Sequence, residues 1–464
     1  MCNMSEKLVR KYGLFTAICM VVGIVIGSGV FFKARDILLL TGGDMPMGIL
    51  AWLIGGGIML VSLLTFSFMG QKYERVNGLV DYAEATVGPK YGYLMGWFCG
   101  TVYFPAMNAV LCYVSALYTM VFVTSAFPGE IWLGVDVEKG AHTIALTLFY
   151  MCMLYGMNTL SPKLAGKFQT STTVIKMIPL VLMAVVGIVA GLISGMLQTN
   201  FATPAMPVNG NDLGADVPLL SSVCATAFAY EGWIIATSIN SEIKDSKKNL
   251  PRALIFGGII IVSIYLFYYI GVAGGATNQE LMTHGAARAF TNLFGNFFGN
   301  VLNLFVAISC LGTANGLMLG CTQCMYSLAS RGQGPSPMTY SQVDRKTNMP
   351  GNSGIFALMV TAAWFLYYYV TNISKLWTGI FAFDSSELPI ITVYVMYLPI
   401  LIQWMRKEKD QNFLRRFLMP GLSLCGCLFM MFASVRAHKM DCLWYLIVYA
   451  VIMAIGALTD KYKK

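Results

Sequence analysis

Long apolar stretches separated by short polar segments make up nearly the whole chain of 464 residues. A membrane-spanning helix needs about 20 mainly apolar residues. The pattern predicts twelve such helices, near residues 13–39, 46–69, 92–124, 141–157, 168–194, 217–240, 253–276, 293–328, 354–371, 375–404, 414–434 and 442–459. The longest connections, near 195–216 and 329–353, carry turn signals and are expected to be loops. The sequence therefore predicts an all-α integral membrane protein with a single membrane domain over residues 1–464.

Composition and charge support this interpretation. Hydrophobic residues make up 57% of the chain and charged residues only 11%, against about 25% charged in a soluble domain. With a cytoplasmic N-terminus, 23 of the 31 Lys and Arg residues fall on the inner side of the predicted helices and 7 on the outer side. This bias follows the positive-inside rule and predicts a multi-pass protein of the cell membrane with both termini in the cytoplasm. The net charge of +9 is thus a sign of topology, and no nucleic-acid partner is expected.

The first predicted helix carries three glycines and a serine at membrane depth, within residues 23–29. Glycine costs about 1 kcal/mol in a helix interior, so this cluster predicts a helix that breaks inside the membrane. A break frees backbone N–H and C=O groups that lipid cannot satisfy and a bound ligand can. The alternative is that Gly23 and Gly27 form a small-residue face for helix packing.

A second unusual segment, Phe228 to Trp233, places Glu231 and Gly232 within the sixth predicted helix. It lies five helices after the first break. This spacing suggests an inverted repeat of five helices, in which each repeat opens on a discontinuous helix and the ligand lies between the two breaks.

Four segments in this order resemble the amino acid, polyamine and organocation (APC) superfamily, and in particular the L-type amino acid transporters and their bacterial relatives. They are the Gly-Ser-Gly-Val-Phe run at 27–31, the Phe-Ala-Tyr-Glu-Gly-Trp run at 228–233, residues 241–245 with 249–252, and the Gly-Thr-Ala-Asn-Gly run at 312–316. The resemblance implies a LeuT-like fold with broken helices 1 and 6. Its first repeat would span 13–194 and its second 217–404, followed by two helices over 414–459. It also implies amino acid transport by alternating access, often as exchange.

The chemistry of an amino acid suits two broken helices. A carboxylate is stabilised by N–H groups at the start of a half-helix, and an ammonium by free carbonyls at the end of another. Gly27, Ser28 and Gly29 are expected to offer N–H donors to the carboxylate. The carbonyls expected to meet the ammonium lie around Val25, Ile26, Phe228, Ala229 and Glu231.

Two aromatic residues are candidates for gating. Phe228 lies beside the second break, where a ring would cover the ligand and exclude water, although most membrane Phe residues serve in packing. Tyr265 in the seventh helix is similar to a position that helps to close the site in relatives, but Tyr268 and Tyr269 are near enough to compete for this role.

Lys176 lies within the fifth predicted helix, where a charged side chain costs about 2.5 to 3.5 kcal/mol. The resemblance implies that its ammonium occupies the place of sodium in sodium-coupled relatives, near carbonyls of the first helix and the hydroxyl of Thr313. It would then replace sodium or carry a coupled proton. The alternative is a lysine that extends to the cytoplasmic surface.

The acidic residues leave open whether the substrate is neutral or cationic. Glu231 lies in the second break, and Asp384 and Glu387 are expected inside the tenth helix. Each is a candidate for binding a cationic substrate, for proton relay or for an internal hydrogen bond. The main hypothesis is a sodium-independent exchanger of L-amino acids. The alternatives are a proton-coupled amino acid permease, a permease for cationic amino acids or polyamines, and a sensor that does not transport.

Other classes find little support. The three histidines form no cluster with a nucleophile, so the chain is not expected to be an enzyme, and no cofactor or metal is expected. Most of the twelve cysteines lie within predicted helices and are expected to be free thiols. Heteromeric members of the family that the chain resembles use a cysteine after the third helix to bind a heavy subunit. Residues 125–141 contain none, so no disulfide-linked partner is expected.

Overall fold

The structure is a computed structural model that describes residues 12–27, 29–73, 78–127, 129, 136–202, 218–235, 237, 243–438 and 440–460. Within these ranges every regular element is a helix. Ten helical stretches are long and apolar enough to cross a membrane. They are α3 (Met45–Lys72), α5 to α6 (Pro89–Ala126), α7 (Ala141–Leu160), α8 to α9 (Pro162–Ser194), α12 (Ser246–Gly275), α15 (Asn296–Ala329), α17 with its extension (Gly351–Ile373), α18 (Leu388–Lys407), η7 with most of α19 (Leu414–Arg436) and α20 (Met440–Thr459).

The pair α1 (Leu14–Val25) and α2 (Gly29–Leu40) is together long and apolar enough for an eleventh crossing, and it is bent by 41° at its break. The sixth predicted span, 217–240, contains α11 (Pro218–Tyr230), a helix of 13 residues that ends at the second break. Five short helices complete the described elements: α4 (Gly78–Thr86), α10 (Met196–Ala202), α13 (Asn278–His284), α14 (Ala286–Phe294) and α16 (Pro337–Tyr340). The coarse prediction of an all-helical membrane protein is therefore confirmed.

The expected start of the tenth helix was wrong. The prediction placed it at residue 375, whereas α18 begins at Leu388. The preceding segment turns repeatedly, with positive φ at Lys375, Gly379 and Phe381. Asp384 Oδ1 accepts a hydrogen bond from the backbone N–H of Ser386 at 2.7 Å, a local bond that competes with helix formation. Asp384 and Glu387 thus precede α18 instead of lying inside it.

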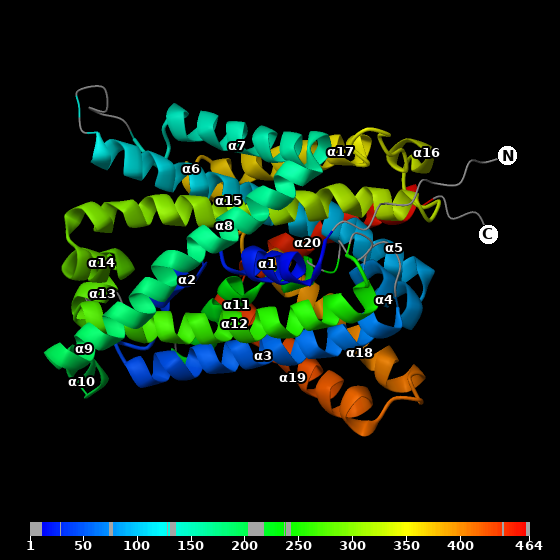
Figure 1. The fold of residues 1–464 in the computed structure, drawn as a ribbon. Helices are drawn as coiled ribbons and strands as arrows, with labels where there is room; N and C mark the ends of the chain where they lie inside the picture. Colours follow the sequence, from blue (N-terminus) through cyan, green and yellow to red (C-terminus); the bar gives the residue numbers. More distant parts are fainter. Residues whose placement is uncertain are drawn as a thin grey trace.

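The long helices run roughly side by side along one axis of the molecule (Figure 1). α15 is the most buried of the long helices described, with α6 packed along it, and α3 packs along α12. α1 is short and lies between α12, α8 and α15. α15 and the mostly buried α1 thus lie near the centre of the bundle, whereas α20 is mostly exposed.

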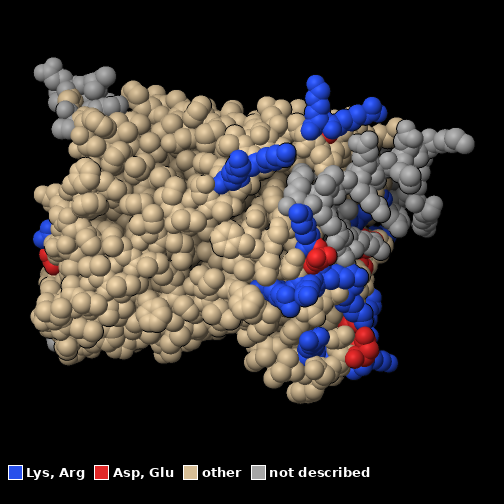
Figure 2. Space-filling model, viewed as in Figure 1, with Lys and Arg blue, Asp and Glu red and all other residues tan. Residues whose placement is uncertain are grey.

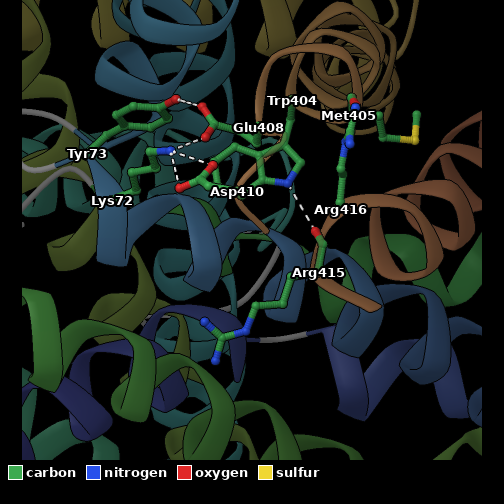
Figure 3. Close-up of polar contacts among 8 residues, drawn as sticks. All are labelled: Lys72, Tyr73, Trp404, Met405, Glu408, Asp410, Arg415 and Arg416. Atoms are coloured by element: carbon green, nitrogen blue, oxygen red, sulfur yellow. Dashed lines mark hydrogen bonds and ion pairs between the residues drawn. The ribbon is translucent and has the colours of Figure 1, made fainter. Parts of the chain in front are cut away.

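Charged side chains gather mostly toward one end of the bundle on the face shown in Figure 2, and we refer to it as the basic end. Here Lys72, at the end of α3, pairs with Glu408 and with Asp410 at 3.1 Å (Figure 3). The Tyr73 hydroxyl also donates to Glu408, and Trp404 Nε1 donates to the Arg415 carbonyl at 3.0 Å. These contacts join the end of α3 to the end of α18 and the start of the next helix.

Candidate functional site

The first helix is broken between α1 and α2. α1 ends at Val25, Ile26 takes an extended conformation with ψ of 92°, and α2 begins at Gly29. A Cβ added to Gly29 would lie 2.7 Å from the Ala229 Cα, so only glycine allows α2 to approach α11 this closely. Ser28, which was predicted to bind the carboxylate, lies outside the described residues.

The second break follows α11. The helix ends at Tyr230, and Gly232 has φ of +98°, a value that favours glycine and turns the chain. The buried Tyr265 hydroxyl lies 3.0 Å from the Ala229 carbonyl and 3.3 Å from the Val25 carbonyl. One side chain of α12 therefore joins both breaks, with its single hydrogen shared between the two acceptors.

A central cavity of about 20 Å³ lies between the breaks, room for about one water molecule. Its lining comes from both broken helices, from α15, and from the η1 (Cys99–Tyr103) and α6 (Phe104–Ala126) part of the third span. The lining residues are Ile24, Val25, Gly27, Gly29, Tyr103, Met107, Leu111, Phe228, Glu231, Gly232, Ile235, Thr313 and Leu317. The start of α2 and the ends of α1 and α11 thus meet at one place. Positive and negative helix ends face the same cavity, which suits a ligand with both an anionic and a cationic group.

Lys176 extends from α8 to the far side of the first break and is fully buried. Its amine donates to the carbonyls of Gly23 at 2.7 Å and Ile26 at 2.5 Å, and lies 3.2 Å from the Ser309 carbonyl and 3.4 Å from the Thr313 hydroxyl. Within the described residues, oxygen atoms without formal charge form this shell. The Ile26 carbonyl, which was expected to meet the ammonium of the ligand, here accepts from Lys176.

Two hydroxyls of α15 reinforce the same carbonyls. Thr313 Oγ1 donates to the Gly23 or Ile26 carbonyl, each at 3.2 Å, and Ser309 Oγ to the Gly27 carbonyl at 3.1 Å or the Ile26 carbonyl at 3.3 Å. The end of α1 is therefore held from α8 and α15 together. Because the group is built from backbone carbonyls of the break, its integrity depends on the helix remaining broken.

Tyr103 was not predicted as a site residue. Its hydroxyl donates to Glu231 Oε1 at 2.5 Å, and both residues line the central cavity. The Tyr394 hydroxyl and the Gly232 N–H are further neighbours of this buried carboxylate. A signal for this position was present in the sequence, because Pro105 interrupts the third predicted helix and follows the π-helical turn η1. Such turns occur often at functional sites.

On the side of the cavity opposite the basic end, Phe228 is half-buried and lies beneath Lys33, whose amine is 5.6 Å from the ring centroid. Lys33 Nζ is 2.9 Å from Glu387 Oε1, and His438 Nε2 is 3.0 Å from Glu387 Oε2. We refer to Lys33, Glu387 and His438 as the outer triad. It joins α2, the segment before α18 and the end of α19.

The outer triad has further charged neighbours, namely Asp36 on α2, Asp384 before α18 and Asp441 on α20. Burial disfavours the charged imidazole of His438, but the hydrogen bond and the charge of Glu387 outweigh it, with smaller contributions from Asp384 and Asp441. The pKa of His438 is therefore raised above its ordinary value of 6.5. The ion pair between His438 and Glu387 should therefore depend on pH.

The predicted site residues that the structure describes fall into two groups, those that line the central cavity and those behind its wall. Val25, Gly27, Gly29, Phe228, Glu231 and Thr313 line the central cavity. Ile26, Ala229, Tyr265 and Lys176 stand behind its wall, where they fix the two breaks to each other and to α8. Asn108 on α6 is directed at Met318, with Nδ2 3.9 Å from the sulfur.

Three hollows follow one another from the centre to the basic end. The central cavity shares Ile24 and Ile235 with an inner cavity of about 10 Å³, which also contacts Asn158, Gln169 and Asn315. The inner cavity shares Tyr12 and Gly166 with a groove of about 1130 Å³ at the basic end. The structure is therefore closed toward the basic end at two constrictions.

Among the described residues, no group of three or more His, Cys, Asp or Glu side chains is placed to hold a metal ion. The cysteines described are free thiols.

Comparison with known proteins gives a consistent result over nearly the full length. Residues 12–458 match the family described as Amino acid permease. The chain is 28% identical to the Serine/threonine exchanger SteT of Bacillus subtilis (strain 168) over 448 residues, which cover 94% of each protein. It is 24% identical to the Asc-type amino acid transporter 1 of Mus musculus, covering 94% of this chain and 79% of the relative. It is 25% identical to the Large neutral amino acids transporter small subunit 2 of Homo sapiens, covering 80% and 68%.

Proposed function

The chain belongs to the amino acid permease family, and on that premise we propose that it is a sodium-independent exchanger of L-amino acids that works by alternating access. It is a transporter of amino acids and not an enzyme. The observation that carries the proposal is the meeting of oppositely charged helix ends at the central cavity. The start of α2 would bind the substrate carboxylate through N–H groups of residues 27–29, and the ends of α1 and α11 would bind its ammonium.

The proposed architecture has twelve membrane helices in one domain over residues 1–464. Helices 1 and 6, formed by α1 with α2 and by the segment that α11 begins, open two inverted repeats over 13–194 and 217–404. The helices of 414–459 follow. The basic end would face the cytoplasm together with both termini, because the basic residues concentrate there.

Lys176 is proposed to take the place of a sodium ion. Its amine supplies one positive charge to carbonyl and hydroxyl oxygens of α1 and α15, and oxygen atoms are the ligands that hard cations prefer. A permanently attached cation would hold the first break in its bent form without an ion gradient. Thr313 would act with it by donating to the same carbonyls.

Phe228 is the proposed gate on the side of the outer triad, since its ring borders the central cavity directly. Tyr265 would act with it by tying the two breaks together when the site is closed. Toward the basic end, the proposed route runs through the inner cavity to the basic groove. It opens when Ile24 separates from Ile235 and Tyr12 from Gly166.

Among the relatives, one is named for serine and threonine exchange. L-Serine is therefore the first substrate to test. No disulfide-linked heavy subunit is proposed, although one relative is named a small subunit, because residues 125–141 of this chain contain no cysteine.

A proton-coupled permease is the second candidate, favoured by one observation. Glu231 is a buried acid that lines the cavity, with the hydroxyls of Tyr103 and Tyr394 beside its carboxylate, an arrangement suited to holding a proton.

Uptake of radiolabelled L-serine and a panel of other amino acids into proteoliposomes tests the two candidates together. Uptake that requires internal amino acid and is indifferent to sodium and to a pH gradient supports exchange. Uptake driven by a proton gradient into empty vesicles supports the second candidate. Failure to transport any amino acid would refute both and favour a sensor.

A further inference from the structure

The groove at the basic end has a lining unlike that of the other hollows. Its cavity of about 1130 Å³ is bordered by Lys163 and Lys167 from the start of α8 and by Lys346 from the connection between α15 and α17. Three amines from two segments far apart in sequence therefore face one hollow. The lining contains no Asp or Glu, and hydroxyl groups such as those of Ser161 and Thr170 complete its polar part.

The three lysines are available for a ligand. Each is exposed, and none has an ion-pair partner in the described part of the structure. The nearby carboxylate of Asp344 accepts the backbone N–H groups of Lys346 at 2.9 Å and Thr347 at 2.8 Å, and its charge offsets part of that of Lys346. Three amines against this one carboxylate leave the groove positive, which favours an anion.

The apolar border of the groove points to a lipid as the source of that anion. Leu160, the last residue of α7, lines the groove and is 72% exposed, and Leu164 in the first turn of α8 is 51% exposed. The same side of α8 continues with the exposed Val174, Ile178 and Val181. An apolar strip long enough for an acyl chain thus leads directly to a cluster of amines. A soluble phosphate ester has no apolar chain to contact this strip.

We propose that this basic groove binds the headgroup of an anionic phospholipid, with the phosphate at Lys163, Lys167 and Lys346 and an acyl chain along the exposed face of α8. A bound headgroup would also contact Tyr12 and Thr16 at the start of α1, which line the same groove. The lipid would therefore lie against the last constriction of the route from the central cavity. This site is independent of which amino acid the protein carries.

The test is a binding titration on the full-length protein in detergent, followed by native mass spectrometry. The probes are phosphatidylglycerol, phosphatidylcholine with the same chains, and glycerol 3-phosphate, which has the phosphate without the tails. The groove variant combines Lys163→Gln, Lys167→Gln and Lys346→Gln. The control combines Lys90→Gln, Lys407→Gln and Lys409→Gln, which removes the same number of exposed charges outside the groove.

We expect phosphatidylglycerol to bind wild type and control alike, and the groove variant at least about tenfold more weakly. Phosphatidylcholine and glycerol 3-phosphate should bind weakly to all three. Equal loss in both triple variants would mean that diffuse charge attracts the lipid, and unchanged binding by the groove variant would place the lipid elsewhere. Glycerol 3-phosphate binding as tightly as phosphatidylglycerol would identify a soluble phosphate ester as the ligand. Each of these three results overturns the proposal.

Two single variants guard against misfolding of the triple variant. Lys163→Gln and Lys346→Gln change different walls of the groove and leave most of the inner positive charge in place. Each should weaken phosphatidylglycerol binding about threefold or more. If neither single variant weakens binding, the convergence of the two segments on one headgroup is refuted.

Discussion

Replacing Lys176 by Met tests whether the buried cation serves transport or the stability of the fold. The variant keeps the length of the side chain and removes the amine. Two hydrogen bonds from a charged donor together contribute about 3 to 6 kcal/mol, and removal of the charge from membrane depth recovers about 2.5 to 3.5 kcal/mol. The Gly23 and Ile26 carbonyls retain hydroxyl donors from Thr313 and Ser309, which limits the loss. The free energy of unfolding is therefore expected to fall by no more than about 3 kcal/mol.

Transport should respond differently from stability. The amine connects α8 to the end of α1 at the break, and without it the bent form competent for binding becomes less populated. A loss of about 1.5 to 3 kcal/mol from that form corresponds to about a 10- to 100-fold slower exchange at low substrate concentration. The assay is L-serine exchange in proteoliposomes, with unfolding in detergent followed in parallel. Lys90→Met, at an exposed position, is the control.

Lys176→Ala extends the test, because it leaves a gap surrounded by the oxygens of Gly23, Ile26, Ser309 and Thr313. If the amine stands in for sodium, exchange by this variant should increase with sodium concentration, while the wild type stays indifferent. Exchange by Lys176→Met at the wild-type rate would refute the reasoning. So would a parallel loss of stability and transport, because the lysine would then be a structural residue only.

Three further changes test other parts of the site. Gly29→Ala would place a methyl group against the backbone of α11 and should abolish most exchange. Gly57→Ala, at a position with open space around it, is the control and should have no effect. Normal exchange by Gly29→Ala would mean that close contact between the two breaks is not required. Tyr103→Phe removes the hydrogen-bond donor to the Glu231 carboxylate and should raise the KM for L-serine about 5- to 10-fold. Tyr113→Phe on the same span serves as the control. If Tyr103→Phe has the same KM as the wild type, this hydrogen bond does not contribute to substrate binding. The ion pair between protonated His438 and Glu387 is fully formed below pH 6.5 and is lost as the pH rises through the raised pKa of His438. The exchange rate should therefore increase with pH, with a midpoint above pH 6.5, and should become independent of pH in His438→Gln. A His438→Gln variant with the wild-type pH profile would contradict this.

Much of the helical plan was predictable because hydrophobic length is read directly from sequence. The span predicted at 46–69 appears as Met45–Lys72, and the one at 293–328 as Asn296–Ala329. The tenth span failed because residues 375–387 are apolar enough to count as helix, while their turns depend on local bonds such as that of Asp384. Hydropathy carries no information about such bonds.

The candidate site was predictable only where backbone chemistry or family resemblance marked it. The glycines of the first break and Gly232 mark positions where a helix must turn, and the resemblance placed Lys176 near Thr313, a proximity that the structure shows at 3.4 Å. Tyr103 and Ile235 escaped prediction because a tyrosine or isoleucine in an apolar helix looks the same whether it faces lipid, a neighbour or a cavity. Which face it takes is decided by packing between distant helices.

The anchors of the first helix show how the two ends can open separately. At the basic end, the Tyr12 carbonyl accepts the Lys244 N–H at 2.8 Å. At the other end, Lys33 pairs with Glu387, and Arg35 donates to the Met282 carbonyl at 2.7 Å. Because the break lies between these anchors, either half of the helix can leave its partners while the other half stays bound. The Tyr12 to Lys244 contact is a backbone hydrogen bond that does not titrate, whereas opening past Phe228 breaks ion pairs that do. The second movement should therefore depend on pH.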